Sequence, residues 1–434
     1  MTEFDKKVLG ILQLAIQHKV SDVHLAAGSI PAFRTHDGIS PLNLPAFTHE
    51  EMLAACQLFV AKPEVKAKLG EITDYDGSFE YPGLGRFRFN IFRHKNQLGA
   101  VLRVIASKVP SIADLGLPPV LKKIAEASRG LVLVTGATGS GKSSTLAAMI
   151  DHINATQACH ILTIEDPIEY VHTPKKSRIT QREVGRDTAD FASALRSALR
   201  QDPDVILVGE MRDIETLDIA LKAAETGHLV FSTVHTTDAI KTIGRLISMY
   251  PAEEQHAVRL RLSDNIHATV SQRLVNSVEP NKKVVAQEIM ISNLAIRDCI
   301  ASDKKTGEMN TFIEKGHEVI GSQTFDQHLS FLVQRGQVSV EVALEAATNP
   351  ADFQRNLAFG EHGHALEGNN AENIQMEPVA PTAEDAKYAI ANAASKPEEK
   401  TSPTATKTTV GSATATATTL PGGPPKIPKP PKAA

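Results

Sequence analysis

The residues best suited to chemistry stand at positions 136–143, where Gly-Ala-Thr-Gly-Ser-Gly-Lys-Ser matches the phosphate-loop pattern G-x-x-x-x-G-K-[ST] at every fixed position. An apolar run, LVLVT, precedes them and a helix-like stretch, SSTLAAMIDHI, follows. Gly136, Gly139 and Gly141 allow the backbone to curl so that its N–H groups point at phosphate oxygens. The start of the following helix adds positive dipole character. This pattern predicts a strand, loop and helix that bind the phosphates of a nucleotide.

Two side chains of this loop have an expected task of their own. Lys142 is expected to reach the β- and γ-phosphates of ATP, and the hydroxyl of Ser143 is expected to coordinate Mg²⁺. ATP and Mg²⁺ are therefore the expected cofactors. The alternative, a glycine-rich turn that binds nothing, fits the complete pattern and its context poorly. The residues expected to contact the nucleotide are Gly136, Thr138, Gly139, Ser140, Gly141, Lys142, Ser143 and Ser144.

Carboxylates end two further apolar runs, at Glu210 and at Glu165-Asp166. The C-terminal ends of parallel strands gather at one edge of a sheet, so we expect these acids to lie beside the phosphate loop. A carboxylate there can orient water for attack on the γ-phosphate or hold the water shell of a metal. We favour Glu210 for metal and water positioning, with Glu165 as the alternative or partner base. Each acid could instead be a capping or turn residue.

Histidines and arginines provide further candidates. His228 and His235 flank the apolar run 229–234, and a histidine at the sheet edge could contact the γ-phosphate; the competing interpretation is a structural histidine. Four arginines occur in or near the strictly alternating stretch RFRFNIF, which begins at residue 86. A guanidinium against the γ-phosphate would stabilise the charge that develops in phosphoryl transfer, and it would have to come by interdomain closure or from a neighbouring subunit. The four are Arg86, Arg88, Arg93 and Arg103, of which Arg88 and Arg103 are the catalytic candidates.

The sequence divides into four regions, of which the folded ones are expected to position these residues. Residues 1–105 are predicted to form a small α/β domain, with a capping-box helix from residue 48 and a hairpin that contains RFRFNIF. Residues 106–120 are the expected linker. In residues 121–358 strands alternate with helices, which predicts a parallel sheet with crossover helices, and beyond about residue 237 the pattern is mostly helical. Residues 359–434 form the fourth region.

That last region is predicted to be a disordered tail rich in Pro, Thr, Ala and Lys. Residues 378–434 hold ten of the chain's 24 prolines and few large apolar residues, too few to offset the entropy of ordering. A solubilising tail is the simpler interpretation, and a basic docking arm is the alternative.

Composition excludes several classes of protein. Lys+Arg total 46 and Asp+Glu total 50, so the net charge of −4 gives no overall attraction for nucleic acid, and we expect no nucleic-acid partner. Three widely spaced cysteines exclude a disulfide framework and a four-cysteine zinc site. No apolar run is long enough to span a bilayer, and the N-terminus lacks signal-peptide character. We therefore expect a cytoplasmic protein without direct membrane insertion.

Taken in order, these motifs resemble the secretion ATPase superfamily and, within it, the type IV pilus retraction ATPases of the PilT type. The motifs span about residues 1–355: SDVHLAAG, RFRFNIF, GATGSGKSSTLAAMI, ILTIEDPIEY, QREVGRDT, ALRSALRQDPDVILVGEMRD and AETGHLVFSTVHTT. The resemblance implies a PAS-like N-terminal domain joined to a RecA-like ATPase domain with a helical C-terminal part, assembled as a homo-hexamer with ATP between the two domains. It makes Lys142 and Ser143 Walker A residues and Glu210 the Walker B glutamate. Glu165 then belongs to the acidic box and His235 to the histidine box.

The function implied by the resemblance is a Mg-ATP-hydrolysing motor for pilus retraction and twitching motility. It would act at the cytoplasmic face of the inner membrane on a pilus platform protein, and a paralogous retraction ATPase is a further candidate partner. The stretch AIRDCI at 295–300 keeps the Ala, Ile and Arg of an AIRNLI-like segment of retraction members but has Asp298 and Cys299. An accessory retraction ATPase of the PilU type is therefore one alternative. A traffic ATPase of a type II or type IV secretion system is the other.

Overall fold

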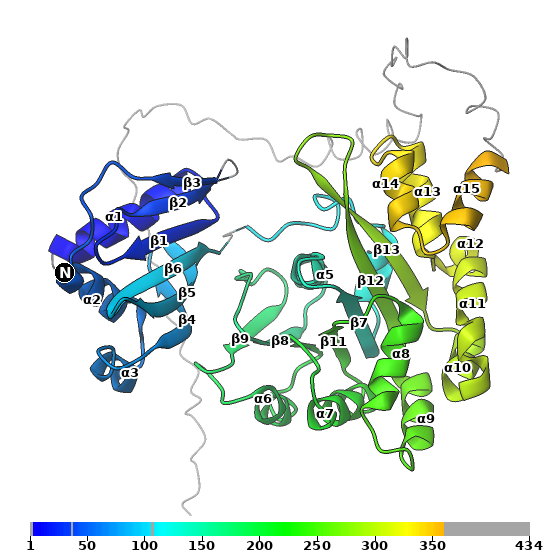
Figure 1. Cartoon of the computed structure of the whole chain (residues 1–434). Coiled ribbons are helices and arrows are strands. Elements are labelled where there is room, and N and C mark those ends of the chain that lie inside the picture. Colours follow the sequence, from blue (N-terminus) through cyan, green and yellow to red (C-terminus); the bar gives the residue numbers. More distant parts are fainter. Residues whose placement is uncertain (1–2, 36–37, 106–107, 360–434) are drawn as a thin grey trace, which may run out of the picture. The chain divides into compact units, whose positions relative to one another are not determined.

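The structure is a computed structural model, and it describes residues 3–35, 38–105 and 108–359 (Figure 1). The predicted tail lies outside the described residues from residue 360 onward. In the part of the chain that is described, no helix is both long and apolar enough to cross a membrane.

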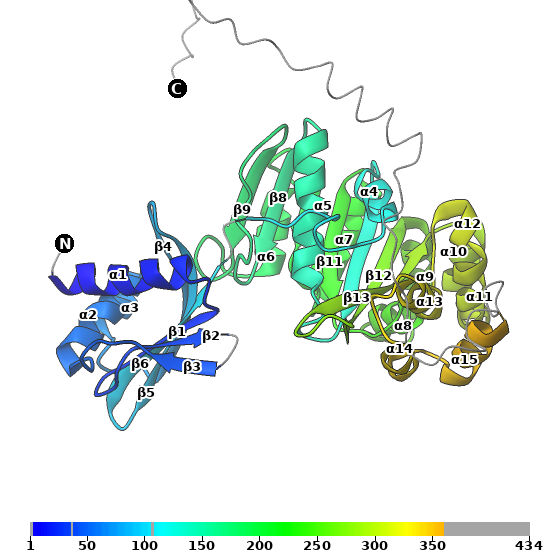
Figure 2. The ribbon, with the colours of Figure 1, turned by 90° about the horizontal axis from the view of Figure 1, so that it is seen from above.

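The N-terminal part forms a six-stranded antiparallel sheet. In spatial order its strands are β3 (Gly38–Pro41), β2 (Ala32–Thr35), β1 (Asp22–Ala26), β6 (Gln97–Val104), β5 (Gly85–His94) and β4 (Asp74–Tyr81). Helices α1 (Glu3–Gln17) and α2 (His49–Phe59) pack on the sheet and share its core (Figure 2), and a short α3 (Pro63–Ala67) follows. As predicted, α2 begins with a capping box, in which Thr48 Oγ1 accepts from Glu51 N at 3.1 Å and Glu51 Oε2 accepts from Thr48 N at 2.7 Å.

The alternation predicted for the RFRFNIF stretch is confirmed in β5. Phe87, Phe89 and Ile91 are buried in the core, while Arg88 is exposed on the opposite face. β5 pairs antiparallel with both of its neighbours, and the register sets Arg88 opposite Arg103 of β6. Directly opposed residues of neighbouring strands share a face, so these two guanidinium groups leave the sheet on the same side.

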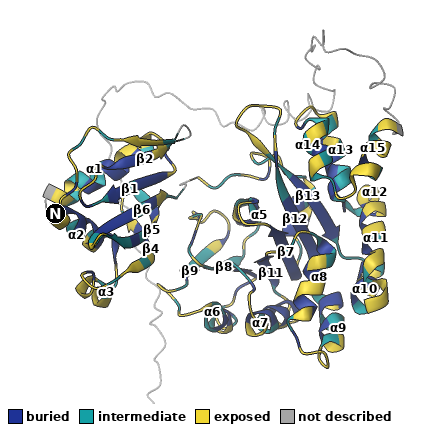
Figure 3. Cartoon of the chain, viewed as in Figure 1, coloured by how far each residue is buried: buried dark blue, intermediate teal, exposed yellow. Residues whose placement is uncertain are grey.

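The second sheet has seven strands, and β7, which leads into the phosphate loop, lies between β12 and β11. In spatial order the strands are β13 (Lys283–Ile291), β12 (Ile266–Asn276), β7 (Gly130–Gly136), β11 (Leu229–Val234), β10 (Val205–Val208), β8 (His160–Glu165) and β9 (Arg178–Glu183). All neighbours run parallel except β12 and β13, which are antiparallel. Every residue of β7, β10 and β11 is buried (Figure 3), as expected for strands covered by helices on both faces.

Helices cover both faces of this sheet. Leu131 and Leu133 of β7 enter the core shared with α6 to α11, and Val132 and Val134 enter the opposite core, shared with α4 and α5. The helices are α4 (Val120–Ala125), α5 (Lys142–Thr156), α6 (Phe191–Ala198), α7 (Ile214–Glu225), α8 (Ala239–Ser248), α9 (Gln255–Asn265), α10 (Leu294–Ala301), α11 (Met309–Lys315), α12 (His317–Ile320), α13 (Phe325–Gln334), α14 (Val340–Ala346) and α15 (Pro350–Phe359), with a 3₁₀ turn at Asp303–Glu308. The predicted alternation of strands and helices is thus confirmed.

The structure differs from the sequence prediction at β12 and β13, which interrupt the region expected to be mostly helical. β12 pairs with β7 and so lies next to the strand that leads into the phosphate loop. Its residues Thr269, Ser271 and Gln272 are polar and yet almost fully buried. They interrupt the apolar run by which a buried strand is predicted, so the sequence pattern does not indicate a strand here.

Candidate active site

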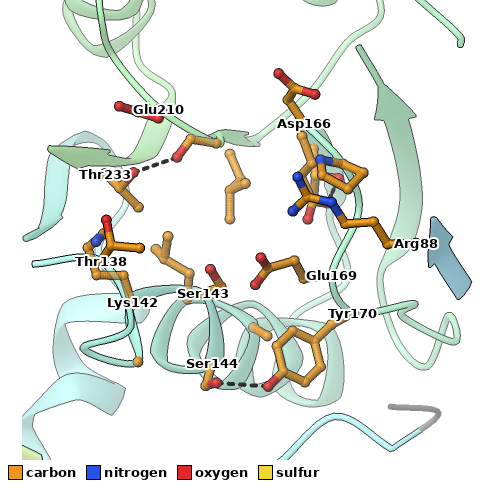
Figure 4. A pocket seen from close by; sticks show the side chains of 18 of the residues that line it. Arg88, Thr138, Lys142, Ser143, Ser144, Asp166, Glu169, Tyr170, Glu210 and Thr233 are labelled. Atoms are coloured by element: carbon orange, nitrogen blue, oxygen red, sulfur yellow. Dashed lines mark hydrogen bonds between the residues drawn. The ribbon is translucent and has the colours of Figure 1, made fainter. Parts of the chain in front are cut away.

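A cavity of about 520 Å³ lies at the C-terminal edge of the parallel strands, in front of the phosphate loop (Figure 4). Most of the predicted site residues line it: Arg88, Arg103, Thr138, Gly139, Gly141, Lys142, Ser143, Ser144, Glu165, Glu210 and His235. Among the residues expected to contact the nucleotide, Gly136 and Ser140 do not line the cavity and are buried. The residues that were selected along the chain therefore converge on one site.

Gly136 shapes the loop at the point where β7 ends. Its φ of +141° is one that residues with a side chain rarely adopt. A Cβ atom there would meet Ser140 Oγ at 2.5 Å and the backbone oxygen of Gln272 at 2.6 Å. Only glycine fits between the loop and the neighbouring strand β12.

We therefore expect Gly136→Ala to distort the loop. Strain of about 1–3 kcal/mol would lower the melting temperature by roughly 2–12 °C and weaken ATP binding more than tenfold. Calorimetry together with a nucleotide titration would measure both effects. Gly244→Ala, in the interior of α8 with no atom near the added methyl group, is the matched control and should leave both unchanged or improve stability. Unaltered ATP binding in Gly136→Ala would contradict the role of this glycine.

Lys142 is held inside the loop. It begins α5, is 8% exposed, and its Nζ donates to the backbone oxygens of Gly136 at 2.9 Å and Ala137 at 3.0 Å. Burial lowers its pKa, and the charges of Glu210 and Glu169 oppose that shift. The ammonium group therefore lies beside the cavity with its donors on loop carbonyls, which phosphate oxygens can replace.

The two serines after Lys142 differ in their surroundings. Ser143 is exposed to the cavity, so its hydroxyl is available to a ligand. The Ser144 hydroxyl lies 2.8 Å from the hydroxyl of Tyr170 (Figure 4). This contact ties the start of α5 to the segment that follows β8.

Glu210 lies two residues beyond the end of β10, and its carboxylate contacts a guanidinium and an imidazole. Its Oε2 accepts from Arg212 Nη2 at 2.7 Å, and its Oε1 lies 3.3 Å from His235 Nε2. Burial acts to raise the pKa of Glu210, but Arg212, His235 and Lys142 outweigh it, so the net shift is downward. Glu210 is therefore a stable carboxylate at the edge of the cavity.

Glu165, the last residue of β8, has the opposite character. Its Oε1 accepts from Thr163 Oγ1 at 2.6 Å and from Gln181 Nε2 at 3.2 Å, both of which are neutral groups. Burial raises the pKa of Glu165 more than these hydrogen bonds lower it. A carboxylate with a raised pKa is the stronger base of the two.

The N-terminal arginines divide into two pairs. Arg88 and Arg103 line the cavity, and Arg103 also donates from Nε to Asp22 Oδ1 at 2.9 Å. Arg93 instead donates to backbone oxygens, among them that of Ile72, and Arg86 pairs with an acid outside the cavity.

Of the two interpretations that the sequence left open for His228, the structure supports the structural one. It precedes β11, so it lies at the end of the strand away from the cavity. Its Nδ1 lies 2.9 Å from the backbone oxygen of Ala223. This is the structural histidine that the sequence left open as the alternative.

Several cavity residues were not singled out from the sequence. Arg212 follows Glu210 by two positions, and Glu169 and Tyr170 follow Glu165 closely. Their position just beyond the ends of buried strands is a signal that could have found them. The contacts of Arg212 with Glu210 and of Tyr170 with Ser144 are visible only in three dimensions.

A phosphate loop between a strand and a helix, with acids from adjoining parallel strands facing it, defines a P-loop nucleotide-binding protein. Residues 80–362 match the family model described as "Type II/IV secretion system protein". The chain belongs to this family, as an ATPase of the PilT type.

Individual relatives show where in the family the chain lies. The type IV pilus retraction ATPase PilT of Pseudomonas aeruginosa is 48% identical over 343 residues, which cover 79% of this chain and 98% of that protein. The type IV pilus ATPase PilU of the same organism is 36% identical over 363 residues, covering 84% and 93%. A crystal structure of the pilus retraction motor PilT with bound ADP superposes with a TM-score of 0.74 at 43% identity, covering 80% of this chain and 99% of that one.

Proposed function

We propose that this chain is a Mg-ATP-hydrolysing motor that drives retraction of a type IV pilus and thereby twitching motility. The observation that carries the proposal is the near-complete match to a retraction ATPase, 98% of whose length is covered, in a chain whose phosphate loop and facing acids share one cavity. The match to PilU is weaker, at 36% identity. This difference favours a retraction motor over an accessory ATPase.

Two residues, Asp298 and Cys299, differ from the AIRNLI-like segment of retraction members, and both are compatible with this function. Cys299 is buried within α10, so its substitution is a matter of internal packing. Asp298 is exposed and is the one of these two changes that a partner would meet.

For the chemistry, we assign roles to the residues that face the cavity. Lys142 would neutralise the β- and γ-phosphates while the loop N–H groups hold their oxygens. Glu165 would accept a proton from the attacking water. Arg88 and Arg103 would approach the γ-phosphate from the N-terminal sheet, and His235 would contact it from the end of β11 and fix Glu210.

Magnesium fits the oxygen donors of this cavity. Mg²⁺ usually keeps several water ligands and takes one or two protein oxygens together with phosphate oxygens. The exposed Ser143 hydroxyl and the ionised Glu210 carboxylate would supply these contacts, directly or through water. When bound, the ion neutralises charge on the phosphates.

We further propose the assembly and location that such a motor requires. The chain would form a homo-hexamer and act at the cytoplasmic face of the inner membrane through a pilus platform protein, with a paralogous retraction ATPase as a second candidate partner. Within the protomer, residues 1–105 would form the PAS-like domain, 106–120 the linker and 121–358 the RecA-like domain.

Deletion of the gene followed by counting of surface pili tests the function. We expect cells with excess pili and no twitching, because pili are extended and not withdrawn. Cells without pili would indicate an assembly ATPase and contradict the proposal. Normal pili together with a secretion defect would indicate a traffic ATPase. Complementation with the wild-type chain should restore twitching.

A further inference from the structure

A second charged cluster lies outside the cavity, between β5 and β9. Arg86 of β5 pairs with Glu183, the last residue of β9, and their side chains are only 9% and 5% exposed. Ser78 of β4 donates to Glu183 Oε1 at 2.5 Å, and Arg86 Nη2 also donates to Ser78 Oγ at 3.1 Å. We refer to Ser78, Arg86 and Glu183 as the clasp.

The clasp is bonded to the loop that carries the acids of the cavity. Glu183 Oε2 accepts from the backbone N–H of Ile168 at 3.1 Å, two residues after Asp166. Glu183 is also the parallel register partner of Glu165, and the next backbone amide, that of Val184, donates to the backbone carbonyl oxygen of Glu165 at 2.9 Å. A displacement of Glu183 would therefore move the backbone on both sides of Asp166.

The clasp also flanks a cavity arginine. Arg86 and Arg88 are two residues apart on β5 and so project from the same face. Ser78 is the register partner of Arg88 on β4. Two members of the clasp thus fix the backbone positions next to Arg88, whose side chain points into the cavity (Figure 4).

Stability alone does not explain a buried ion pair at this place. The free energy needed to take two charges out of water can exceed the gain from their attraction, and a well-packed apolar pair is often as stable or more stable. What such a pair does impose is a defined geometry, because every oxygen of Glu183 needs its own donor. Ser78, Arg86 and Ile168 supply those donors.

We propose that Ser78, Arg86 and Glu183 are positioning residues for ATP hydrolysis, which hold Arg88 and the acidic loop in register with the bound nucleotide. None of the three lines the cavity, so they act through their neighbours. The proposal rests on the ATPase activity assigned above.

Steady-state ATPase assays on the full-length protein test the clasp. We expect Arg86→Ala and Glu183→Gln to lower kcat about 10- to 100-fold while KM for ATP changes less than about threefold, because the phosphate loop is untouched. Glu80→Gln is the matched control. Glu80 touches Arg86 from the solvent side at 3.4 Å and is half exposed, so kcat should stay within about twofold.

A double-mutant cycle separates positioning from a structural role. If Arg86 acts largely through Arg88, the double variant Arg86→Ala, Arg88→Ala should lose much less than the product of the two single losses. Losses that multiply, or an unchanged kcat in Arg86→Ala, would overturn the proposal. Should Arg86→Ala fail to fold, Ser78→Ala, which removes one hydroxyl, enters the same cycle under the same criteria. An inactive wild type would count against the proposed function and not against the clasp.

Discussion

Replacement of Lys142 by alanine is expected to abolish ATP hydrolysis and to weaken ATP binding by about two to three orders of magnitude. The ammonium group is largely buried and faces the cavity, where Glu210 and Glu169 favour its charged form. Removing one partner of a buried, hydrogen-bonded charge pair typically costs about 2–5 kcal/mol, and each 1.4 kcal/mol is tenfold in affinity. The phosphates would meet the loop without its strongest electrostatic contact.

Titration of a fluorescent ATP analogue, followed by an ATPase assay, measures both effects. Lys123→Ala, an exposed lysine of α4 away from the cavity, is the control and should behave as wild type. The fold of the Lys142 variant should survive, because the two lost hydrogen bonds, to the carbonyls of Gly136 and Ala137, lie within the phosphate loop and not between distant elements. Wild-type turnover in Lys142→Ala would be incompatible with a P-loop ATPase.

The phosphate loop and the acids could be located from the sequence because local patterns specify them. Residues 136–143 carry their whole function within eight positions, and Glu165 and Glu210 each follow an apolar run that only a buried strand explains. The C-terminal ends of such strands meet at one sheet edge, so the convergence of these residues followed from topology alone.

Other features depend on contacts between distant residues. The clasp joins Arg86 to Glu183 across 97 positions, and nothing in either local sequence specifies the partner. β12 was not predicted because it carries the polar residues Ser271 and Gln272. They can be buried because they form hydrogen bonds with Thr135 and Thr145 on neighbouring elements, at 3.1 and 2.8 Å. Polar residues that are satisfied inside a core have the same sequence signature as surface residues.

The structure also separates two glutamates that the sequence left open. Burial acts to raise the pKa of Glu210, but Arg212, His235 and Lys142 together lower it, so Glu210 is a weak base but a good partner for a metal ion and its waters. Burial raises the pKa of Glu165 more than its hydrogen bonds to the neutral Thr163 and Gln181 lower it, which favours proton acceptance at neutral pH. We therefore expect the two carboxylates to act in different steps.

Glu210→Gln should consequently bind ATP but hydrolyse it about 10²- to 10⁴-fold more slowly. The amide keeps the shape of the side chain and loses the charge that Arg212, His235 and a hydrated metal ion require. Because metal contact is impaired, the residual activity should need more Mg²⁺ for half-saturation. Glu215→Gln, an exposed acid on α7, is the control. An unchanged Mg²⁺ dependence together with an unchanged kcat would exclude Glu210 from the reaction.

The pH profile of Glu210→Gln, compared with that of Glu165→Gln, then identifies the base. A general base works only when deprotonated, so kcat of the wild type should fall as the pH is lowered through the pKa of Glu165. Because burial raises that pKa, the fall should begin at a higher pH than the roughly 4.3 of an ordinary glutamate would give. In Glu210→Gln, kcat should be lower at every pH but should show the same fall at low pH (the acid limb of the profile). In Glu165→Gln this fall should be absent. If the limb disappears in Glu210→Gln instead, Glu210 is the base, and the low pKa imposed by Arg212 must rise when nucleotide binds.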